Sequence, residues 1–528
     1  MSNHAYESAA ALRPSSNGPI PISTLCERFS LAPASAEDAA ALNDLSILGV
    51  SVDSADTVPG ELFVGLPGFT VHGARFAADA VASGAVAVLT DADGAQIVHQ
   101  TAPGTPVLVH SDPRAVVGPL SAEVYHHPAR GLVATAVTGT NGKTTTAYFL
   151  DAILSAHVGG CMVAGTVELR VGERSVESPR TTVEAPVLQR MMALAVEDKV
   201  GAASLEASSH AIVLHRLDGI VVDVAGFTNL QRDHLDFHKT MEGYLEAKAQ
   251  LFTPEHARRG VVCVDDQWGA ALAAEAPIEI DRVRAYPGET PADWWVSDAA
   301  VSMTDSATTF TLHGPDGEKI EASCPLPGLV NVQNAALALV MAIRAGVPAA
   351  TAAAALAGAH NIPGRMQRIS QRDGRRGLCI VDFAHTPDAM ELALKAVRPI
   401  TPGRLIVVFG SDGDRDQGKR PMLGEVCARL ADVLVVTDVN PRSEDPQLIR
   451  NAILEGVRGV RPDLTDVEEI TTWRGDAVRR GVELCGPDDT VIVTGKGHEP
   501  FLEMAGEFIR YNDAPVMAEA VEEKWGRA

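Results

Sequence analysis

The residues best suited to chemistry form one short glycine loop. Residues 139–144 read Gly-Thr-Asn-Gly-Lys-Thr and follow "GLVATAV", an apolar run of strand length. A strand that leads through glycines to a Lys-Thr pair at a helix start can bind phosphate, because backbone N–H groups and the helix dipole attract an anion. Val137, however, stands where the Walker pattern requires a glycine. The loop is therefore a damaged nucleotide loop, a tight turn with a surface lysine, or a related loop for another acceptor.

Acidic and histidine side chains follow the next strand-like runs. Glu206 ends "GAASLE", and the segment after "VDVAGFTN" contains Asp233, His234 and Asp236. A hard cation such as Mg²⁺ needs oxygen ligands, and nucleotide phosphates supply only some of them. Lys248 lies on a short amphipathic stretch, where its local sequence favours a solvated lysine. Spacing alone makes none of these residues a specific signal.

The elements that must position these side chains alternate between strands and helices, which predicts parallel sheets covered by helices. We expect an α/β protein of three domains. A smaller α/β N-terminal domain spans residues 1–130, a central P-loop-type ATPase domain with a parallel sheet spans 131–363, and a C-terminal Rossmann-like domain spans 364–528. The first 20 residues are rich in Ser, Pro and Ala, and we expect them to be disordered.

Composition excludes several classes of protein. The formal net charge of −24 argues against a nucleic-acid-binding protein, which needs a basic surface to displace counterions from phosphates. No run of about 18 apolar residues occurs, and the N-terminus lacks a basic start followed by an apolar stretch. Seven cysteines without paired spacing are typical of reduced thiols. We expect a cytoplasmic protein without a membrane span.

Taken together, the ordered motifs resemble the Mur ligases, ATP-dependent enzymes that extend the peptidoglycan stem peptide by one amino acid. The resemblance runs from Asp53 to Glu499, and "TGTNGKTT" is similar to that family's own short phosphate loop. The pattern is most similar to the third adder, the MurE type, which extends UDP-N-acetylmuramoyl-L-alanyl-D-glutamate. The resemblance implies a monomer that binds this nucleotide and a diamino acid.

The resemblance also implies roles for the matching residues of the central domain. Lys143 would hold the β- and γ-phosphates of ATP, Thr144 and Glu206 would hold one Mg²⁺, and His234 would ligate a second. Lys248 matches the family's carbamylated lysine, whose reaction with CO₂ requires a deprotonated amine. The implied nucleotide-binding loop consists of Gly139, Thr140, Asn141, Gly142, Lys143, Thr144 and Thr145, and the implied metal ligands are Thr144, Glu206, His234 and Lys248.

Other matching positions surround the two remaining substrates. The residues implied around the adenosine are Asn334, Arg365, Asp382 and His385. Lys419 would lie near the transferring phosphate and Arg415 near the incoming amino acid. The residues implied for the UDP-sugar peptide are Ser54, Thr181, Thr182, Ser208 and Arg216. Ala55 and Leu214 depart from the family pattern at positions near the implied substrate contacts.

The identity of the amino acid depends on two segments. "TDVNPRSEDP" resembles the loop that reads the side-chain carboxylate of meso-diaminopimelate, with Asn440 and with Arg442 as a fork-shaped partner. "GKGHE" contributes Gly495 and Glu499, which suit the distal ammonium. Val439 replaces the usual aspartate, and we expect its loss to free the guanidinium of Arg442. L-Lysine, L-ornithine or another diamino acid are the alternatives.

Two rival interpretations have different sequence requirements. A folylpolyglutamate synthase-like ligase shares the architecture and the reaction, but it needs no UDP-sugar-binding region, and "DSADTVPGELFVGL" and "VNPR" argue against it. An inactive nucleotide-binding relative would be expected to lose charged motif positions. All of these positions are filled here, from Lys143 and Glu206 to His234 and Lys248.

Overall fold

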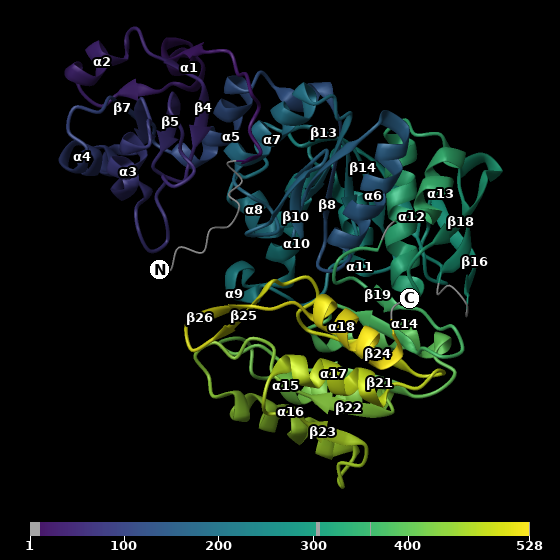
Figure 1. The fold of residues 1–528 in the computed structure, drawn as a ribbon. Helices are drawn as coiled ribbons and strands as arrows, with labels where there is room; N and C mark the ends of the chain where they lie inside the picture. Colours follow the sequence, from purple (N-terminus) through teal and green to yellow (C-terminus); the bar gives the residue numbers. More distant parts are fainter. Residues whose placement is uncertain (1–10, 303–306, 360, 527–528) are drawn as a thin grey trace. The chain divides into compact units, whose positions relative to one another are not determined.

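The structure, a computed structural model, describes residues 11–302, 307–359 and 361–526. The chain forms two compact units: Met1–Trp295 with Ala336–Ala355, and Val296–Ala335 with Leu356–Ala528 (Figure 1). Each of the three large sheets lies inside one of the three predicted domains, which confirms the α/β class with three sheets. The domain boundaries themselves stay a prediction.

The N-terminal sheet belongs to the first unit and has the order β2-β7-β6-β5-β4. Four of its strands are parallel, and β2 pairs antiparallel with β7. Its strands are β2 (Ala32–Pro33), β4 (Gly49–Ser51), β5 (Glu61–Val64), β6 (Ala87–Thr90) and β7 (Val107–Val109), beside a ribbon of β1 (Ile20–Pro21) and β3 (Ser46–Ile47). The helical segments are α1 (Ile22–Phe29), α2 (Ala36–Leu42), η2 (Gly73–Phe76), α3 (Ala77–Ala82), α4 (Ala92–Thr101), α5 (Pro113–Val124) and η3 (Pro128–Gly131).

The largest sheet has the order β11-β10-β9-β12-β8-β13-β14-β15-β16-β17-β18. The strands β9, β12, β8, β13, β14 and β15 are parallel neighbours, and the first four are almost entirely buried, as expected where helices cover both faces. In the first unit the strands are β8 (Val133–Thr138), β9 (Cys161–Ala164), β10 (Glu168–Val171), β11 (Arg174–Glu177), β12 (Ala202–Glu206), β13 (Val222–Phe227), β14 (Ala257–Cys263) and β15 (Glu279–Arg284). Its helices are α6 (Lys143–Val158), α7 (Ala185–Glu197), α8 (Ser209–Val213), α9 (Leu235–His238), α10 (Met241–Ala249), η4 (Gln250–Phe252) and α11 (Gln267–Glu275).

The chain passes from the first unit to the second within β16 (Trp294–Val301). The antiparallel pair β17 (Thr308–His313) and β18 (Lys319–Cys324), with η5 (Pro315–Gly317) between them, belongs to the second unit. The helices α12 (Leu329–Arg344) and α13 (Ala349–Ala357) follow. The unit boundary therefore cuts α12 between Ala335 and Ala336.

The C-terminal sheet lies in the second unit and has the order β19-β20-β24-β21-β22-β23. Its helices divide between the faces, since α15 packs on α14 and α16 while α17 packs on α18. The strands are β19 (Gln367–Ser370), β20 (Leu378–Val381), β21 (Leu405–Phe409), β22 (Val433–Val436), β23 (Val467–Glu469) and β24 (Thr490–Val493), with a hairpin of β25 (Phe501–Met504) and β26 (Glu507–Arg510). The helices are α14 (Pro387–Val397), η6 (Arg398–Ile400), α15 (Lys419–Leu430), α16 (Pro446–Val460), α17 (Arg474–Leu484) and α18 (Asp513–Trp525).

The N-terminal segment corrects one expectation. Residues 1–10 lie outside the described residues, but residues 11–20, which we expected to be disordered, are anchored in the first unit. Leu12 is buried in the hydrophobic core of the central sheet, and the guanidinium of Arg13 forms ion pairs with Asp56 and Glu61. Burial and charge pairing hold this segment in spite of its loop-like composition.

Among the described helices, none has both the length and the apolar composition needed to cross a membrane.

Candidate active site

The glycine loop joins the central strand β8 to α6, as the sequence predicts. Val137 is the fifth residue of β8 and pairs with Glu206, so this loop starts later than a Walker loop would and needs no glycine there. Gly142 is the N-cap of α6 with φ of 90°. Gly139 has φ of 145°, and a Cβ atom on it would lie 1.9 Å from Oγ1 of Thr228. Glycine is required at position 139 because both the backbone conformation and the space exclude a side chain.

Lys143 is the first residue of α6, and its ammonium folds back over the loop. Its Nζ donates to the carbonyl oxygens of Gly139, at 2.9 Å, and Thr140, at 3.0 Å. Thr145 is buried in the same helical turn. A cation at a helix N-terminus, above a glycine loop, is a site that attracts phosphate.

Three side chains that were not predicted as site residues follow the end of β13 and bond the glycine loop. Thr228 donates to the carbonyl of Asn141 at 2.6 Å, and the side chain of Asn229 both accepts from and donates to the Asn141 backbone at 3.1 Å. Gln231 accepts from the side chain of Asn141 at 2.7 Å. The signal was present in "FTNLQ", which places amide and hydroxyl groups directly after a strand. These bonds preorganise the loop.

Glu206 ends β12, as predicted, and its carboxylate is only 1% exposed. Thr144 donates to it through Oγ1 at 3.0 Å, and Thr166 donates through its backbone N–H at 2.7 Å and its hydroxyl at 2.9 Å. A buried carboxylate beside a threonine hydroxyl is an oxygen donor set that suits Mg²⁺. In residues 11–302, 307–359 and 361–526, no three His, Cys, Asp or Glu side chains form a metal-binding group, so phosphate and water oxygens would have to complete the shell.

Lys248 is buried rather than solvated. It lies near the end of α10 with 1% exposure, and its Nζ donates to the carbonyl of Gly139 at 2.8 Å and lies 4.4 Å from the ring centroid of Tyr244. Burial, and then the positive charge of Lys143, lower the pKa of Lys248 well below its ordinary value. The amines of Lys143 and Lys248 thus meet at one carbonyl oxygen, and the more buried one favours its neutral form.

His234 lies in a group of aromatic rings rather than against Glu206. It adopts φ of 53° before α9, and its ring packs edge-on against His210, with centroids 4.9 Å apart. His238 stacks on Tyr244 at 4.9 Å and hydrogen-bonds Ser209. Burial lowers the pKa of all three histidines, that of His238 to about 4. These imidazoles are therefore neutral at pH 7, the form in which histidine ligates a metal.

Four of the five residues implied for the UDP-sugar peptide lie in one hydrogen-bonded patch beside Glu206. Thr182 donates to the carbonyl of Glu206 at 2.6 Å and contacts Ser208, while Arg216 donates to the carbonyl of Thr182 at 3.1 Å. The hydroxyl of Thr181 bonds that of Thr166 at 3.2 Å.

Ser54 belongs to a separate loop that is ordered by its neighbours. The carboxylate of Asp53 accepts from the N–H of Ala55 at 3.0 Å, and the buried guanidinium of Arg190 pairs with Asp56 at 2.6 Å. This ion pair ties the loop to α7 of the central region within the same unit. Sequence patterns did not identify Arg190, since it lies in an ordinary amphipathic helix.

The residues implied around the adenosine lie in the second unit. Asp382 follows β20 and accepts from the N–H groups of Met366 and Ala384. The guanidinium of Arg365 lies 4.3 Å from the ring centroid of Phe383, which also packs on His385. The Oδ1 atom of Asn334 is buried and has no hydrogen-bond partner within the described parts of the chain. An unsatisfied buried acceptor is costly, and a ligand N–H would remove that cost.

The loop after β21 carries the next two predicted residues. Lys419 is the first residue of α15, and Arg415 is exposed at the loop tip. Arg420, which no sequence pattern identified, is buried and forms a bidentate pair with Glu444 at 2.8 and 2.9 Å. This pair joins the loop after β21 to the loop after β22 and so fixes their separation.

A buried polar network connects the residues implied for the amino acid. Asn440 donates to Asp412 at 3.0 Å and to Glu499 at 3.1 Å, and it accepts from Nζ of Lys496 at 2.9 Å. Lys496 also donates to Glu499 at 3.2 Å. Burial lowers the pKa of Lys496, and the carboxylate of Glu499 opposes that shift. Gly495 precedes this lysine with φ of 106°.

The contacts of Arg442 contradict the expectation that Val439, in place of the usual aspartate, frees its guanidinium. Val439 is buried and packs against Gly410 and Gly495 at the edge of the sheet. A Cβ atom added to Gly410 would lie 3.1 Å from Cγ2 of Val439, and one added to Gly495 would lie 3.0 Å from it. The guanidinium of Arg442 is not free, because its Nε donates to Glu503 at 3.1 Å and its Nη1 to the carbonyl of Gly413 at 3.3 Å. The orienting acid comes from β25.

Comparison with known proteins matches the three sheet-containing regions to one family. Three family descriptions match consecutive parts of the chain: "Mur ligase family, catalytic domain" at residues 46–125, "Mur ligase middle domain" at 137–342 and "Mur ligase, glutamate ligase domain" at 364–497. A Streptomyces avermitilis protein named UDP-N-acetylmuramoyl-L-alanyl-D-glutamate--2,6-diaminopimelate ligase is 43% identical over 483 residues, which are 92% of this chain and 94% of that protein.

Two further relatives extend the match. A Leifsonia xyli protein named UDP-N-acetylmuramyl-tripeptide synthetase is 42% identical over 508 residues, 95% of this chain and 96% of that protein. A solved structure of a UDP-N-acetylmuramoyl-L-alanyl-D-glutamate--2,6-diaminopimelate ligase is 31% identical, with a TM-score of 0.64 over 92% of this chain and 96% of that chain. Identity at this level over nearly the whole length shows that the chain belongs to the Mur ligase family.

Proposed function

We propose that this ligase adds meso-2,6-diaminopimelate to the D-glutamate of UDP-N-acetylmuramoyl-L-alanyl-D-glutamate. The D-glutamate carboxylate attacks the γ-phosphate of ATP and releases ADP. The amine of the diamino acid then attacks the acyl phosphate, forms the C–N bond and loses a proton, and phosphate leaves. The printed names of the Streptomyces and other curated relatives support this substrate pair.

The observation that carries the proposal is the meeting of two amines at the carbonyl of Gly139. Lys143, at the helix N-terminus, is suited to hold the β- and γ-phosphates, where its charge offsets the charge of the transferring group. Lys248, buried with a lowered pKa, supports modification by CO₂, because only a neutral amine forms a carbamate. A carbamate would turn this buried amine into an acid beside the phosphate loop.

The residues around Glu206 fit a magnesium ion. Thr144 and Glu206 would supply a hydroxyl and a carboxylate, and His234 and a carbamylated Lys248 would supply ligands to a second ion. Bound Mg²⁺ would neutralise charge on the phosphates during transfer. The protein's own part is to hold these oxygens in place, which Thr166 and Thr182 do by bonding Glu206 from two sides.

Selection of the amino acid is assigned to the second unit. Arg442 can pair with a second carboxylate, while Gly495 and Glu499 would offer oxygen acceptors to the distal ammonium, and Asn440 holds Glu499 by donating to it. The match of residues 46–125 to a Mur ligase domain supports a UDP-sugar substrate over a folylpolyglutamate-type substrate. L-Lysine and L-ornithine have no second carboxylate, so neither would offer Arg442 a partner on the substrate. The name of the Leifsonia relative does not state the amino acid.

The working form proposed is a cytoplasmic monomer without a nucleic-acid partner. The net charge of −24 supports the last point. Light scattering on the purified protein tests the monomer, and fractionation of cells tests the location.

Phosphate release from ATP tests the reaction directly. Purified protein is supplied with Mg²⁺, UDP-N-acetylmuramoyl-L-alanyl-D-glutamate and, in parallel, meso-diaminopimelate, L-lysine or L-ornithine. Release with meso-diaminopimelate alone is the expected result. Release with only lysine or ornithine would keep the ligase and overturn the amino acid. Absence of release from folded protein that still binds ATP would overturn the substrate assignment.

A further inference from the structure

The hairpin β25–β26 is docked on the loop that carries Arg442. The backbone N–H of Arg442 donates to the carbonyl of Glu503 at 3.0 Å, and the N–H of Ala505 donates to the carbonyl of Arg442 at 2.7 Å. The N–H of Glu503 also donates to Oδ1 of Asn440 at 3.2 Å. The hairpin therefore extends the loop as a short strand pairing, and Arg442 and Met504 form a β-bridge.

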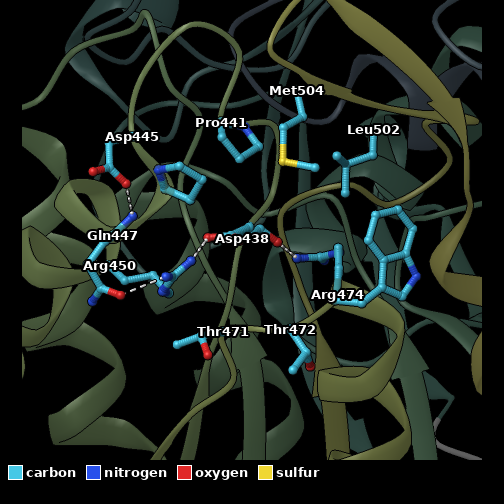
Figure 2. A pocket seen from close by; sticks show the side chains of 12 residues that line it. Asp438, Pro441, Asp445, Gln447, Arg450, Thr471, Thr472, Arg474, Leu502 and Met504 are labelled. Atoms are coloured by element: carbon cyan, nitrogen blue, oxygen red, sulfur yellow. Dashed lines mark hydrogen bonds and ion pairs between the residues drawn. The ribbon is translucent and has the colours of Figure 1, made fainter.

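The side chains of β25 alternate between two environments. Figure 2 shows Leu502 and Met504 at the pocket beside Pro441, and both residues line it. Successive strand residues point to opposite faces, so Glu503 lies on the other face, where its carboxylate reaches Nε of Arg442 at 3.1 Å. The apolar residues anchor the strand, and that packing aims the acid.

The opposite end of the loop is held by buried arginines. Asp438 accepts from Nη1 of Arg450 through its carboxylate and from Nη1 of Arg474, at 2.8 Å, through its backbone carbonyl (Figure 2). Arg474 is itself locked by a bidentate pair with Asp513 at 2.8 Å. With the backbone fixed on both sides of Arg442, the remaining freedom is in its side-chain torsions, and Glu503 restricts them.

The contacts of Arg442 leave one edge of its guanidinium for a ligand. Nε is bonded to Glu503, and Nη1 is bonded only weakly to the carbonyl of Gly413, at 3.3 Å. The side chains of Arg442 and Glu503 are 18% and 32% exposed, so solvent and solutes reach the pair. A guanidinium held through Nε presents Nη1 and Nη2 as a fork that matches the two oxygens of a carboxylate.

From this geometry we infer that Glu503 is a positioning residue that orients the Arg442 fork toward the second carboxylate of a dicarboxylic diamino acid. The inference rests on the proposed function, which assigns that carboxylate to Arg442. It also explains how the loop tolerates Val439: with no acid at position 439, Arg442 is paired with an acid from the neighbouring hairpin instead. Glu503 acts through Arg442 and touches no reacting atom.

The test compares Glu503→Ala and Glu503→Gln with Glu507→Gln, a matched control on the exposed strand of the same hairpin. Phosphate release is measured while meso-diaminopimelate or ATP is varied. Glu503→Ala is expected to raise KM for meso-diaminopimelate roughly 10-fold, with a smaller change in kcat and no change in KM for ATP. Glu503→Gln keeps an oxygen acceptor for Nε of Arg442, so its KM for meso-diaminopimelate is expected to stay close to that of the unaltered protein. Glu507→Gln is expected to have the same KM as the unaltered protein.

A second variant separates positioning from a structural role. In an Arg442→Ala background, adding Glu503→Ala is expected to leave KM for meso-diaminopimelate unchanged, because the group it orients is gone. Equal 10-fold losses in both backgrounds, or an unchanged KM in Glu503→Ala alone, would overturn the inference while the ligase activity stands. If the unaltered protein releases no phosphate with any diamino acid, the proposed function falls, and this inference falls with it.

Discussion

Two buried lysines, one in each compact unit, have different surroundings, which suit one for reactivity and the other for a structural role. Lys248 in the first unit bonds a backbone carbonyl and lies near a second cation, Lys143. Lys496 in the second unit bonds Glu499, Asn440 and the carbonyl of Phe501. Both are at most 1% exposed. The difference is a hydrogen-bonded carboxylate: Glu499 favours the charged amine of Lys496, whereas at Lys248 the charge of Asp233 only partly opposes the effects of burial and of Lys143.

The comparison explains what each lysine can do. A buried amine without a hydrogen-bonded acid is easier to deprotonate and is therefore a better nucleophile toward CO₂. A buried amine with an acid and two further acceptors is a structural cross-link, which here holds the loops after β22 and β24 together. The first arrangement suits reactivity, and the second suits a rigid amino-acid site.

Replacing Lys248 should have the largest effect. Lys248→Ala removes the group that a carbamate would form on, and we expect phosphate release to fall by roughly 1,000-fold. Lys248→Arg should be equally inactive, since a guanidinium stays protonated and forms no carbamate. Added formate, a small carboxylate, should restore part of the activity of Lys248→Ala but not of Lys248→Arg. Full activity of either variant in a phosphate-release assay would contradict the reactive role.

Replacing Lys496 should act on stability. Lys496→Met removes the ammonium from Glu499, Asn440 and the carbonyl of Phe501 and leaves Glu499 with Asn440 as its donor, and we expect a loss of about 3 kcal/mol in the free energy of unfolding. Urea titration of the second unit's transition measures it. The control is Lys395→Met, which removes an exposed helix ion pair with Glu391 and should cost less than about 0.5 kcal/mol. A Lys496→Met protein as stable as the control would mean that the network adds little.

The pH dependence of stability should reveal the lowered pKa of Lys248. The unfolded state binds a proton on this lysine up to its ordinary pKa, whereas the folded state releases it at lower pH. Between those two values the unfolded state holds more protons, so stability rises with pH, by at most about 1.4 kcal/mol per unit. Lys248→Met should remove this slope. The measurement is urea unfolding from pH 7 to 9 in CO₂-free buffer, and parallel slopes for both proteins would show an ordinary pKa.

Much of the site could be predicted because its parts are local in the chain. An apolar run, two glycines and a Lys-Thr pair specify a strand, a turn with positive φ and a helix start within a dozen residues. Glu206, Asp382 and Arg442 follow apolar runs, and strand ends are where parallel sheets place ligand groups. The alternation of strand-like and helical runs likewise predicted the α/β class.

The missed residues depend on pairings between distant segments. Asn229 reaches the loop from 88 residues away, and Glu503 reaches Arg442 from 61 residues away. Glu503 lies in an ordinary strand sequence, and the amide of Asn229 follows a strand, but nothing in the local sequence shows that it faces the glycine loop. The same limit explains the error at Val439, because the sequence showed an acid missing from its usual place but could not show one supplied by a neighbouring hairpin.

The sequence by itself determined the strand-loop-helix unit, the alternation that builds three sheets, and which chemical groups are available at the strand ends. Only the tertiary structure decided their state. Lys248 is a surface lysine by local pattern and a buried amine with a lowered pKa in the folded chain, because packing α10 against the phosphate loop removes it from water and sets it beside Lys143. Protonation and orientation depend on solvation and on nearby charges, and these exist only when distant segments are brought together.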